Sequence, residues 1–344
     1  MLAVELVAPR RLEPRDVPDP PEPGPGEALV RLRAVGLCGS DMHWYLEGGI
    51  GAVRAVYPMV LGHEPAGEVA AAGPGVTLAP GQRVSIEPTV TCGHCEFCLR
   101  AAFNLCPAGV FMGGPQAPGF FREYAVVPAH NLEAVPDGMS FEDAALIEPL
   151  AVLVNALEHA PIRLGDTVAV AGAGSIGLVA IAMARIAGAA RVLACDRVPH
   201  RLALARAMGA DVTTLVPGQS FAGAVRDDTR GRGADVVIEA AGAPETIDAS
   251  IAAARQGGTV VLIGLPSMQA FAVDVMAAMA KELRLQTVKR SNHRGAAAKK
   301  ILLSGMFPGG LVTHRLPLER VQDAAEMLAD YADGAGKIMI GING

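Results

Sequence analysis

Aromatic residues are scarce in this sequence: they fill 4% of its 344 positions, while hydrophobic residues as a whole make up 51%. The apolar residues are therefore mostly Ala, Val, Leu and Ile. Short aliphatic side chains suit helices that pack on a buried parallel sheet. A chain of this length exceeds what one hydrophobic core usually holds, so we expect two domains.

Runs of basic residues are also lacking, and the formal net charge is −6. Nucleic acids are bound through clustered Lys and Arg, so we expect no nucleic-acid partner. The N-terminus has no basic segment followed by an apolar run, and no signal peptide is predicted. The uncharged stretch 168–184 contains three glycines and is better explained as strand, turn and helix than as a membrane span. We expect a cytoplasmic protein without a membrane partner.

Cysteine is scarce but unevenly placed, because four of the six cysteines fall within 92–106. Clustered cysteines without a secretion signal indicate metal ligands before disulfides. Four thiolates leave no open coordination position, which predicts a closed, structural zinc site that staples a lobe with little core of its own. The four expected ligands are Cys92, Cys95, Cys98 and Cys106, and His94 between them is interpreted as a bystander. The alternative is a set of free or redox-active cysteines.

The pattern of predicted secondary structure changes near position 166. Before it, short β-like runs at 27–34, 67–72, 83–86 and 123–127 predict an irregular, mostly β domain. Ser140 predicts a helix N-cap, with the helix interrupted at 148–149 and a second helix over 151–159. After 166, strands at 167–171, 191–194, 235–240 and 259–263 alternate with helices at 175–187, at 199–208 and from 244 onward. This alternation predicts a doubly wound parallel sheet, and a last short strand is expected at 337–340.

A glycine-rich turn lies between the first of these strands and its helix. Its residues are Gly172, Gly174, Ser175, Ile176 and Gly177. The first glycine permits the tight turn, the second lets the backbone approach a pyrophosphate, and the third lets helix and strand pack closely. The helix N-terminus then faces the phosphate charge.

Asp196 ends the next strand, where a carboxylate would accept hydrogen bonds from the adenine ribose hydroxyls. This favours NAD over NADP, although Arg197 and Arg201 could each pair with a 2′-phosphate. The alternative is a glycine turn in an ordinary strand–helix–strand unit.

A second set of metal-ligand types lies in the N-terminal part: Cys38, His63 and Glu64, with Glu148 as a further carboxylate. Few protein ligands leave an open position, which distinguishes catalytic from structural zinc. Each residue alone is also compatible with an ordinary core or surface role. Together with a dinucleotide site they predict hydride transfer in which zinc lowers the pKa of an alcohol.

A proton path is expected beside this second set. Ser40 and His43 follow Cys38 closely and could pass the alcohol proton to solvent. Alternatively, Ser40 is a turn residue and His43 a surface residue.

These motifs together resemble the zinc-containing medium-chain dehydrogenase/reductases, and within them the sorbitol/polyol (xylitol) dehydrogenase branch. The similarity covers nearly the whole chain. The segments that carry it are 36–43, 61–64, the four-cysteine lobe, 147–150, 172–177 and 311–318.

The resemblance implies an α/β architecture with a Rossmann doubly wound parallel sheet and a mostly β, GroES-like catalytic domain. The catalytic domain would comprise 1–153 with 288–344, including a zinc lobe at 88–110, and the NAD-binding domain 154–287. It implies one catalytic zinc on Cys38 and His63, with Glu64 or Glu148 and a water, and one structural zinc. Ser40 and His43 match the family's proton-relay positions. A homodimer or homotetramer is implied as well.

Two departures from the branch concern the substrate. Trp44 and Ser291 stand where many sorbitol dehydrogenases have Tyr, and both positions border the family's substrate pocket. The expected reaction is oxidation of a secondary alcohol, such as sorbitol or xylitol, to a ketose. L-threonine and 2,3-butanediol remain alternative substrates, and a cofactor-binding structural protein is the non-enzymatic alternative.

Overall fold

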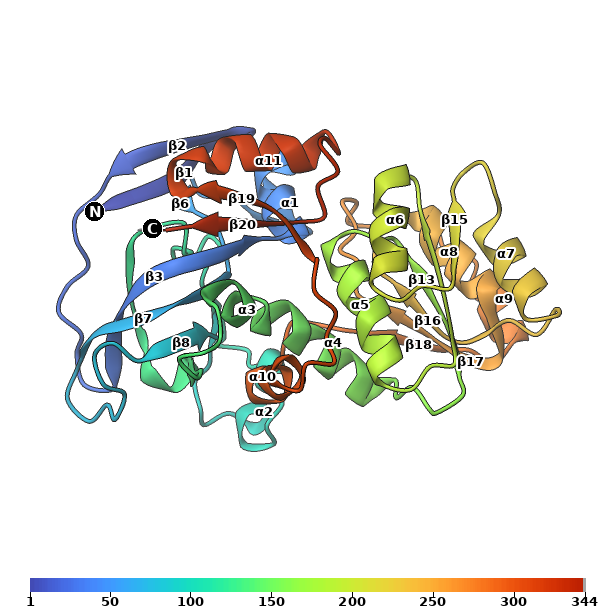
Figure 1. Cartoon of the computed structure of the whole chain (residues 1–344), viewed down its shortest axis with the longest axis horizontal. Coiled ribbons are helices and arrows are strands. Elements are labelled where there is room, and N and C mark those ends of the chain that lie inside the picture. The colour runs from blue at the N-terminus through green and yellow to red at the C-terminus, as the bar shows by residue number, and fades with distance from the viewer. Residues whose placement is uncertain (343–344) are drawn as a thin grey trace. The chain divides into compact units, whose positions relative to one another are not determined.

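A computed structural model describes residues 1–342 of the chain, which form two compact units (Figure 1). The first unit comprises Met1–Val152, Arg290–Ser304 and the residues from Val312 on. The second comprises Leu153–Lys289 and Gly305–Leu311. The second unit is therefore inserted into the first along the chain.

The first unit is rich in short strands. They are β1 (Leu2–Ala8), β2 (Arg11–Asp16), β3 (Glu27–Leu37), β4 (Gly49–Ile50), β5 (Val53–Arg54), β6 (Met59–Val60), β7 (Glu64–Ala72), β8 (Arg83–Ile86), β9 (Thr89–Val90), β10 (Val110–Phe111), β11 (Tyr124–Pro128), β12 (Leu132–Ala134), β19 (Val312–Pro317) and β20 (Lys337–Gly341). The helices are α1 (Gly39–Glu47), α2 (Glu96–Leu99), α3 (Phe141–Ala145), α10 (Gly295–Leu303) and α11 (Val321–Ala329), with 3₁₀ turns at Phe103–Leu105, Ala129–Asn131 and Leu318–Arg320. Helix α4 (Ile147–His159) runs from the first unit into the second.

The main sheet of the first unit has the strand order β12-β8-β7-β3-β20-β19, with β11 also paired to β3. Strand β3 is its centre, and its alternating residues Ala28, Val30 and Leu32 are fully buried. Gly36 on β3 pairs with Glu64 of β7 on one side and with Met339 of β20 on the other. A Cβ at Gly36 would collide with the Glu64 carboxylate and the Lys337 side chain, so glycine is required where these two side chains meet.

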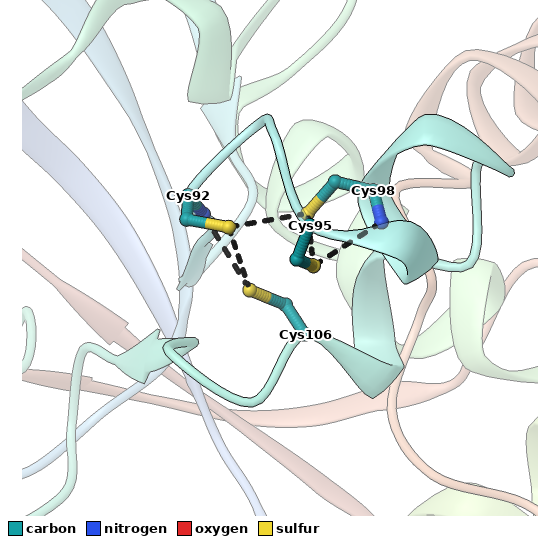
Figure 2. A group of neighbouring side chains, drawn as sticks. All are labelled: Cys92, Cys95, Cys98 and Cys106. Atoms are coloured by element: carbon teal, nitrogen blue, oxygen red, sulfur yellow. Dashed lines mark hydrogen bonds between the residues drawn. The ribbon is translucent and has the colours of Figure 1, made fainter.

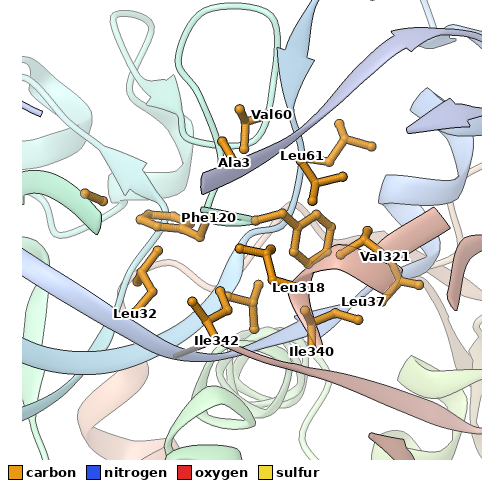
Figure 3. Packing of buried hydrophobic residues seen from close by; sticks show 14 of the residues in the cluster. Ala3, Leu32, Leu37, Val60, Leu61, Phe120, Leu318, Val321, Ile340 and Ile342 are labelled. Atoms are coloured by element: carbon orange, nitrogen blue, oxygen red, sulfur yellow. The ribbon is translucent and has the colours of Figure 1, made fainter. Parts of the chain in front are cut away.

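The core of the first unit joins both ends of the chain (Figure 3). Phe120 and Phe121 are fully buried in it, and Leu37, Val321 and Ile340 pack in the same cluster. Residues from the last 30 positions thus complete a core begun by β1 and β3, which fixes β20 beside the residues that follow β3. Burying apolar surface stabilises this arrangement by about 25 cal/mol per Å².

The second unit is a six-stranded sheet with the order β15-β14-β13-β16-β17-β18, and every pairing is parallel. Its strands are β13 (Thr167–Ala171), β14 (Arg191–Asp196), β15 (Val212–Leu215), β16 (Ala234–Glu239), β17 (Ala254–Leu262) and β18 (Arg284–Thr287). Its helices are α5 (Ser175–Ile186), α6 (Pro199–Ala207), α7 (Phe221–Asp228), α8 (Pro244–Ala253) and α9 (Val275–Ala280). The order reverses between β13 and β16, as in Rossmann folds, which confirms the predicted fold class.

The structure differs from the sequence-based prediction around Glu148. The predicted interruption at 148–149 is wrong, because the break lies at Leu146 and α4 begins at Ile147. Pro149 therefore sits in the first turn of α4, where its missing N–H costs no helical hydrogen bond. The predicted N-cap at Ser140 is correct, since its hydroxyl accepts from the Asp143 N–H at 3.0 Å. Among residues 1–342, no helix combines the length and apolarity that a membrane crossing requires.

Candidate metal centres and cofactor site

Asp41 joins the two segments that carry the first candidate metal site. Cys38 is the N-cap of α1, and Asp41 in the first turn accepts a hydrogen bond from the Cys38 N–H at 3.0 Å. Its other oxygen accepts from the Gly62 N–H at 3.1 Å, just before His63. Asp41 is almost fully buried, so these bonds are not exchanged for water. The carboxylate therefore fixes Cys38 and His63 relative to each other.

His63 is oriented by the same carboxylate. Its Nδ1 lies 3.2 Å from Asp41 Oδ1 and donates to it, which directs Nε2 toward Ser40 Oγ at 3.2 Å. Burial alone would lower the pKa of His63, but the charges of Asp41 and Cys38 raise it well above its ordinary value. The imidazole is thus placed where its Nε2 attracts an electron-pair acceptor, either a proton or a metal cation.

Glu64 brings a carboxylate to the same place. The Sγ of Cys38, a ring nitrogen of His63 and a carboxylate oxygen of Glu64 all lie within 4.8 Å of one another. Glu64 is 1% exposed and is ion-paired with Lys337, which is fully buried. Within the described residues, Glu64 Oε1 has no hydrogen-bond partner. A thiolate, an imidazole and an orphaned buried carboxylate oxygen are donors that fit zinc with an open position.

Glu148 lies in the first turn of α4 and lines a cavity of about 70 Å³. The same cavity is lined by Glu87, His130, Asn131 and His293. Burial, together with the charges of Glu64 and Glu87, raises the pKa of Glu148 to about 8 against the opposing effect of His63. Glu148 does not belong to the group of three close donors. The charges of His63 and Glu64 in that group nevertheless affect the pKa of Glu148.

The two candidate relay residues lie on α1. Ser40 contacts His63, as described above, and His43 pairs with Glu47 one turn along the helix, at 3.1 Å between Nδ1 and Oε2. The sequence patterns do not predict helix α1, in whose first turn Ser40 lies. The transfer of a proton between Ser40 and His43 stays a prediction.

The four clustered cysteines converge, as Figure 2 shows. Their sulfurs lie within 4.8 Å of one another, with Cys95 and Cys98 at 3.5 Å and Cys92 and Cys106 at 3.6 Å. The backbone N–H groups of His94 and Cys95 lower the pKa of Cys92 to about 6. No disulfide joins the described cysteines. Four sulfurs around one point, with N–H donors that favour thiolate, fit a closed tetrahedral zinc site.

The glycine turn has the predicted geometry at the end of β13. Gly172 has φ +96°, and an added Cβ would lie 2.9 Å from that of Ala241. A Cβ at Gly177 would collide with the Gly172 carbonyl, which explains the close approach of helix and strand. A Cβ at Gly174 would meet only Arg201 Nη1, at 3.8 Å, so the backbone there stays open to a ligand. Ser175 and Ile176 begin α5, whose N-terminus faces this opening.

Asp196 supports the turn from β14. Its Oδ2 accepts from the Ala173 N–H at 2.7 Å and its Oδ1 from the Val198 N–H at 2.8 Å. Arg201 Nη1 lies 4.0 Å from Asp196 Oδ2, while Arg197 is exposed. The carboxylate therefore stands beside the glycine turn, with one guanidinium close to it.

Sequence reasoning missed two functional residues, Asp41 and Lys337. Asp41 could have been found, because an acid three residues after an N-cap is a capping signal. Lys337 is a lysine at the start of an apolar run, but only the pairing of β20 with β3 shows that it faces Glu64.

The two departures noted in the sequence are both buried. Trp44 belongs to the core of the first unit, and the Ser291 hydroxyl donates to Glu87 Oε2 at 2.6 Å. Ser291 thus makes a short polar contact with the cavity wall that also carries Glu148.

Two protein families match the sequence. Residues 24–137 match the alcohol dehydrogenase GroES-like domain, and residues 175–303 match the zinc-binding dehydrogenase domain. Sorbitol dehydrogenase of Gallus gallus is 40% identical over 92% of this chain and 89% of its own. The Bacillus subtilis (strain 168) sorbitol dehydrogenase is 36% identical over 91% and 90%. An L-arabinitol 4-dehydrogenase of Hypocrea jecorina is 37% identical over 92% and 85%.

Solved structures share the fold over nearly the whole chain. The alcohol dehydrogenase TADH from Thermus sp. ATN1 has a TM-score of 0.91 and 32% identity, with all of both chains covered. A zinc-binding dehydrogenase from Sinorhizobium meliloti 1021, bound to NADP, has a TM-score of 0.90 and 31% identity over 99% and 98% of the chains. The 2R,3R-butanediol dehydrogenase from Bacillus subtilis has a TM-score of 0.88 and 27% identity over 99% of both.

Proposed function

Because the chain belongs to the zinc-binding dehydrogenase family and is an oxidoreductase acting on CH–OH groups, we propose that it oxidises a secondary hydroxyl of a polyol to a ketone, with NAD as the hydride acceptor. The convergence of Cys38, His63 and Glu64 in one buried cluster carries the proposal. Relatives named sorbitol and arabinitol dehydrogenase favour a polyol such as sorbitol or xylitol.

Cys38 and His63 would hold the catalytic zinc, together with one carboxylate. Glu64 lies with these two donors but is ion-paired with the buried Lys337, whereas Glu148 lies outside the group of close donors. We propose that Glu64 or Glu148 supplies the carboxylate ligand as the site changes state. When bound, zinc would lower the pKa of a substrate hydroxyl. By accepting from His63 Nδ1, Asp41 would keep the Nε2 lone pair available for the metal.

Ser40 and His43 would carry the alcohol proton. The Ser40 hydroxyl lies at His63, beside the proposed metal position, and His43 stands one turn further along α1. Glu47 holds the His43 imidazole, which is partly exposed to solvent. Ser40 would accept the substrate proton while passing its own proton toward His43, and His43 would in turn release a proton to water.

The nicotinamide cofactor would bind in the second unit. Gly172, Gly174 and Gly177, with the amides of Ser175 and Ile176, would cradle the pyrophosphate, and Asp196 would accept from the adenine ribose. We propose NAD as the preferred form, because a 2′-phosphate would meet the Asp196 carboxylate. Arg201 and Arg197 supply the positive charge that would moderate this preference.

The four-cysteine lobe would hold a second, structural zinc. Its four sulfurs, which lie within 4.8 Å of one another, would complete a tetrahedral shell and leave no position for substrate. The predicted cytoplasmic location agrees with thiols kept reduced as metal ligands.

A homo-oligomer, a dimer or tetramer, is proposed from one face of the second unit. Strand β18 pairs only with β17 within the described residues, and Met276 and Met279 on the neighbouring α9 are 71% and 65% exposed. An unpaired strand edge and exposed methionines in the preceding helix are features typical of a protein interface.

2,3-Butanediol is the second candidate substrate, favoured by the fold shared with the 2R,3R-butanediol dehydrogenase. L-threonine stays a third. Family membership speaks against a purely structural protein. The close grouping of Cys38, His63 and Glu64 also favours a catalytic metal site.

The test is NADH production by the purified, zinc-loaded protein across sorbitol, xylitol, arabinitol, 2,3-butanediol and L-threonine, with and without a chelator. Chelator-sensitive turnover of a polyol is expected. Turnover of L-threonine or butanediol alone would select that alternative. No turnover in protein that carries two zinc ions per chain would refute the proposed activity.

A further inference from the structure

The segment 290–293 has an unusual backbone. Arg290, Asn292 and His293 have φ angles of 58°, 49° and 55°. These lie in the left-handed region, which residues other than glycine seldom adopt. Such a conformation persists only where surrounding contacts over-determine it, and strain of this kind gathers at functional sites. The contacts that hold this segment in its strained conformation therefore indicate its function.

One end of the segment faces the candidate catalytic site. The Arg290 guanidinium lies 4.1 Å from the centroid of the Phe111 ring, and that ring lies 5.2 Å from the ring of His63. Ser291 donates to Glu87, which shares its cavity with Glu148. Glu87 and Glu148 also act electrostatically on Arg290. The Arg290 guanidinium, a planar group with five N–H donors, thus lies beside the site where an alcohol would react.

The other end of the segment is held by the four-cysteine lobe. Asn292 Oδ1 accepts from the Asn104 N–H at 3.4 Å, two residues before Cys106. The His293 ring lies 4.8 Å from the Phe103 ring at an interplanar angle of 33°. His293 Nε2 donates to the Thr89 carbonyl at 3.0 Å. Thr89 pairs with Phe111 in the β9–β10 ribbon from which the lobe projects.

We propose that the four-cysteine lobe is a positioning element for substrate specificity, because Phe103 and Asn104 hold the 290–293 segment in the conformation that presents Arg290 to the substrate. The ligand of Arg290 would be a hydroxyl of a polyol, remote from the carbon that is oxidised. This inference rests on the proposed polyol oxidation for its substrate, but not for the contact between lobe and segment.

The first variant is Phe103→Ala, and Phe97→Ala is its matched control. Both remove a phenyl ring from the same lobe, but among the ring contacts of the described residues Phe103 faces His293 of the segment, whereas Phe97 faces Arg100. In zinc-loaded Phe103→Ala, amide hydrogen exchange of the peptide covering 288–294 should be about fivefold faster. KM for the polyol should rise about tenfold while kcat stays within about twofold, as expected for lost substrate binding. Phe97→Ala should change neither quantity.

Asn292→Gly is the second variant, because glycine keeps the left-handed backbone while removing the side-chain acceptor. Like Phe103→Ala, it should speed amide hydrogen exchange of the peptide covering 288–294 and raise KM for the polyol. Zinc content, measured by atomic absorption, must stay at the wild-type value in each variant. Unchanged exchange and KM in both variants would overturn the proposal, as would an equal response to Phe97→Ala. A wild-type protein that oxidises no polyol would refute the proposed function, while the exchange comparison would still decide whether the lobe holds the segment.

Discussion

The buried pair of Lys337 and Glu64 offers the sharpest test of how the catalytic cluster is held together. Lys337 is completely buried, is ion-paired with Glu64 and donates to the Leu37 carbonyl at 3.0 Å. Burial alone would lower the pKa of Lys337, but the charge of Glu64 and that of Cys38 raise it. Lys337→Met keeps most of the side-chain volume and removes the charge. The Glu64 carboxylate would then be buried without a counter-charge.

The expected loss of stability is large. Removing one partner of a buried ion pair costs about 3–5 kcal/mol, since the other charge is left uncompensated. The unsatisfied Leu37 carbonyl adds about 1 kcal/mol. We therefore expect the free energy of unfolding of the first unit to fall by about 5 kcal/mol, a substantial part of the 5–15 kcal/mol typical of a domain.

The assay is urea unfolding followed by the fluorescence of Trp44, the only tryptophan of the chain, which is buried in the core of the first unit. Both proteins are measured after chelator treatment, so that no zinc ion at Cys38 and His63 offsets the charge of Glu64. Lys281→Met is the control, because Lys281 belongs to the second unit, where it donates to the carbonyls of Ile251, Ala252 and Ala254. It should leave the Trp44 transition unchanged.

A double variant with Glu64→Gln separates charge from packing. It should recover part of the loss, since no buried charge is then left without a partner. A loss below about 1 kcal/mol for Lys337→Met would refute the reasoning, because an exposed pair would cost no more than that.

Three further predictions concern the metal, the cofactor and pH. Cys38→Ser should abolish turnover and leave NAD affinity within about twofold, measured by titration; joint loss of both would contradict separate sites for metal and cofactor. Asp196→Ala should narrow the preference for NAD over NADP by about tenfold in kcat/KM, and an unchanged ratio would exclude the role given to this carboxylate. Burial would raise the pKa of Asp235, but hydrogen bonds from Arg232, Arg255 and the Thr167 N–H lower it overall. A lowered carboxyl pKa stabilises the fold above the unfolded value of about 4 and loses this effect as pH falls further. Asp235→Asn should therefore cost about 2 kcal/mol at pH 7, with the difference from wild type shrinking below about pH 4 in urea unfolding; a constant difference would contradict the assignment.

The second unit could be predicted in detail because its signals are local. A buried parallel strand is a continuous apolar run, a glycine turn has fixed spacing, and proline marks the first turn of a helix. The strand at 167–171 and the helix start at Pro199 follow these rules in the structure. The fold class and the dehydrogenase family were accordingly predictable, and both predictions are confirmed.

The first unit was predicted less well, because its site depends on pairings between distant residues. Glu148 was expected next to a helix interruption, yet a proline in the first turn is also compatible with a helix that begins at Ile147. The contact between Lys337 and Glu64 spans most of the chain and requires the pairing of β20 with β3. No local pattern encodes such a pairing. The roles of the metal and relay residues stay predictions.

The charges of the catalytic cluster explain why it would hold a cation. Asp41, Glu64 and Glu148 are buried, and the Cys38 thiol adds a fourth group that can become an anion. Lys337 faces Glu64 and His63 faces Asp41, so each of these two carboxylates has a basic partner in the described residues. Ionising Glu148 and Cys38 as well would leave buried anions in excess of their partners, which is costly. A divalent cation would offset this excess, and zinc binding would then stabilise the fold as well as supply the chemistry.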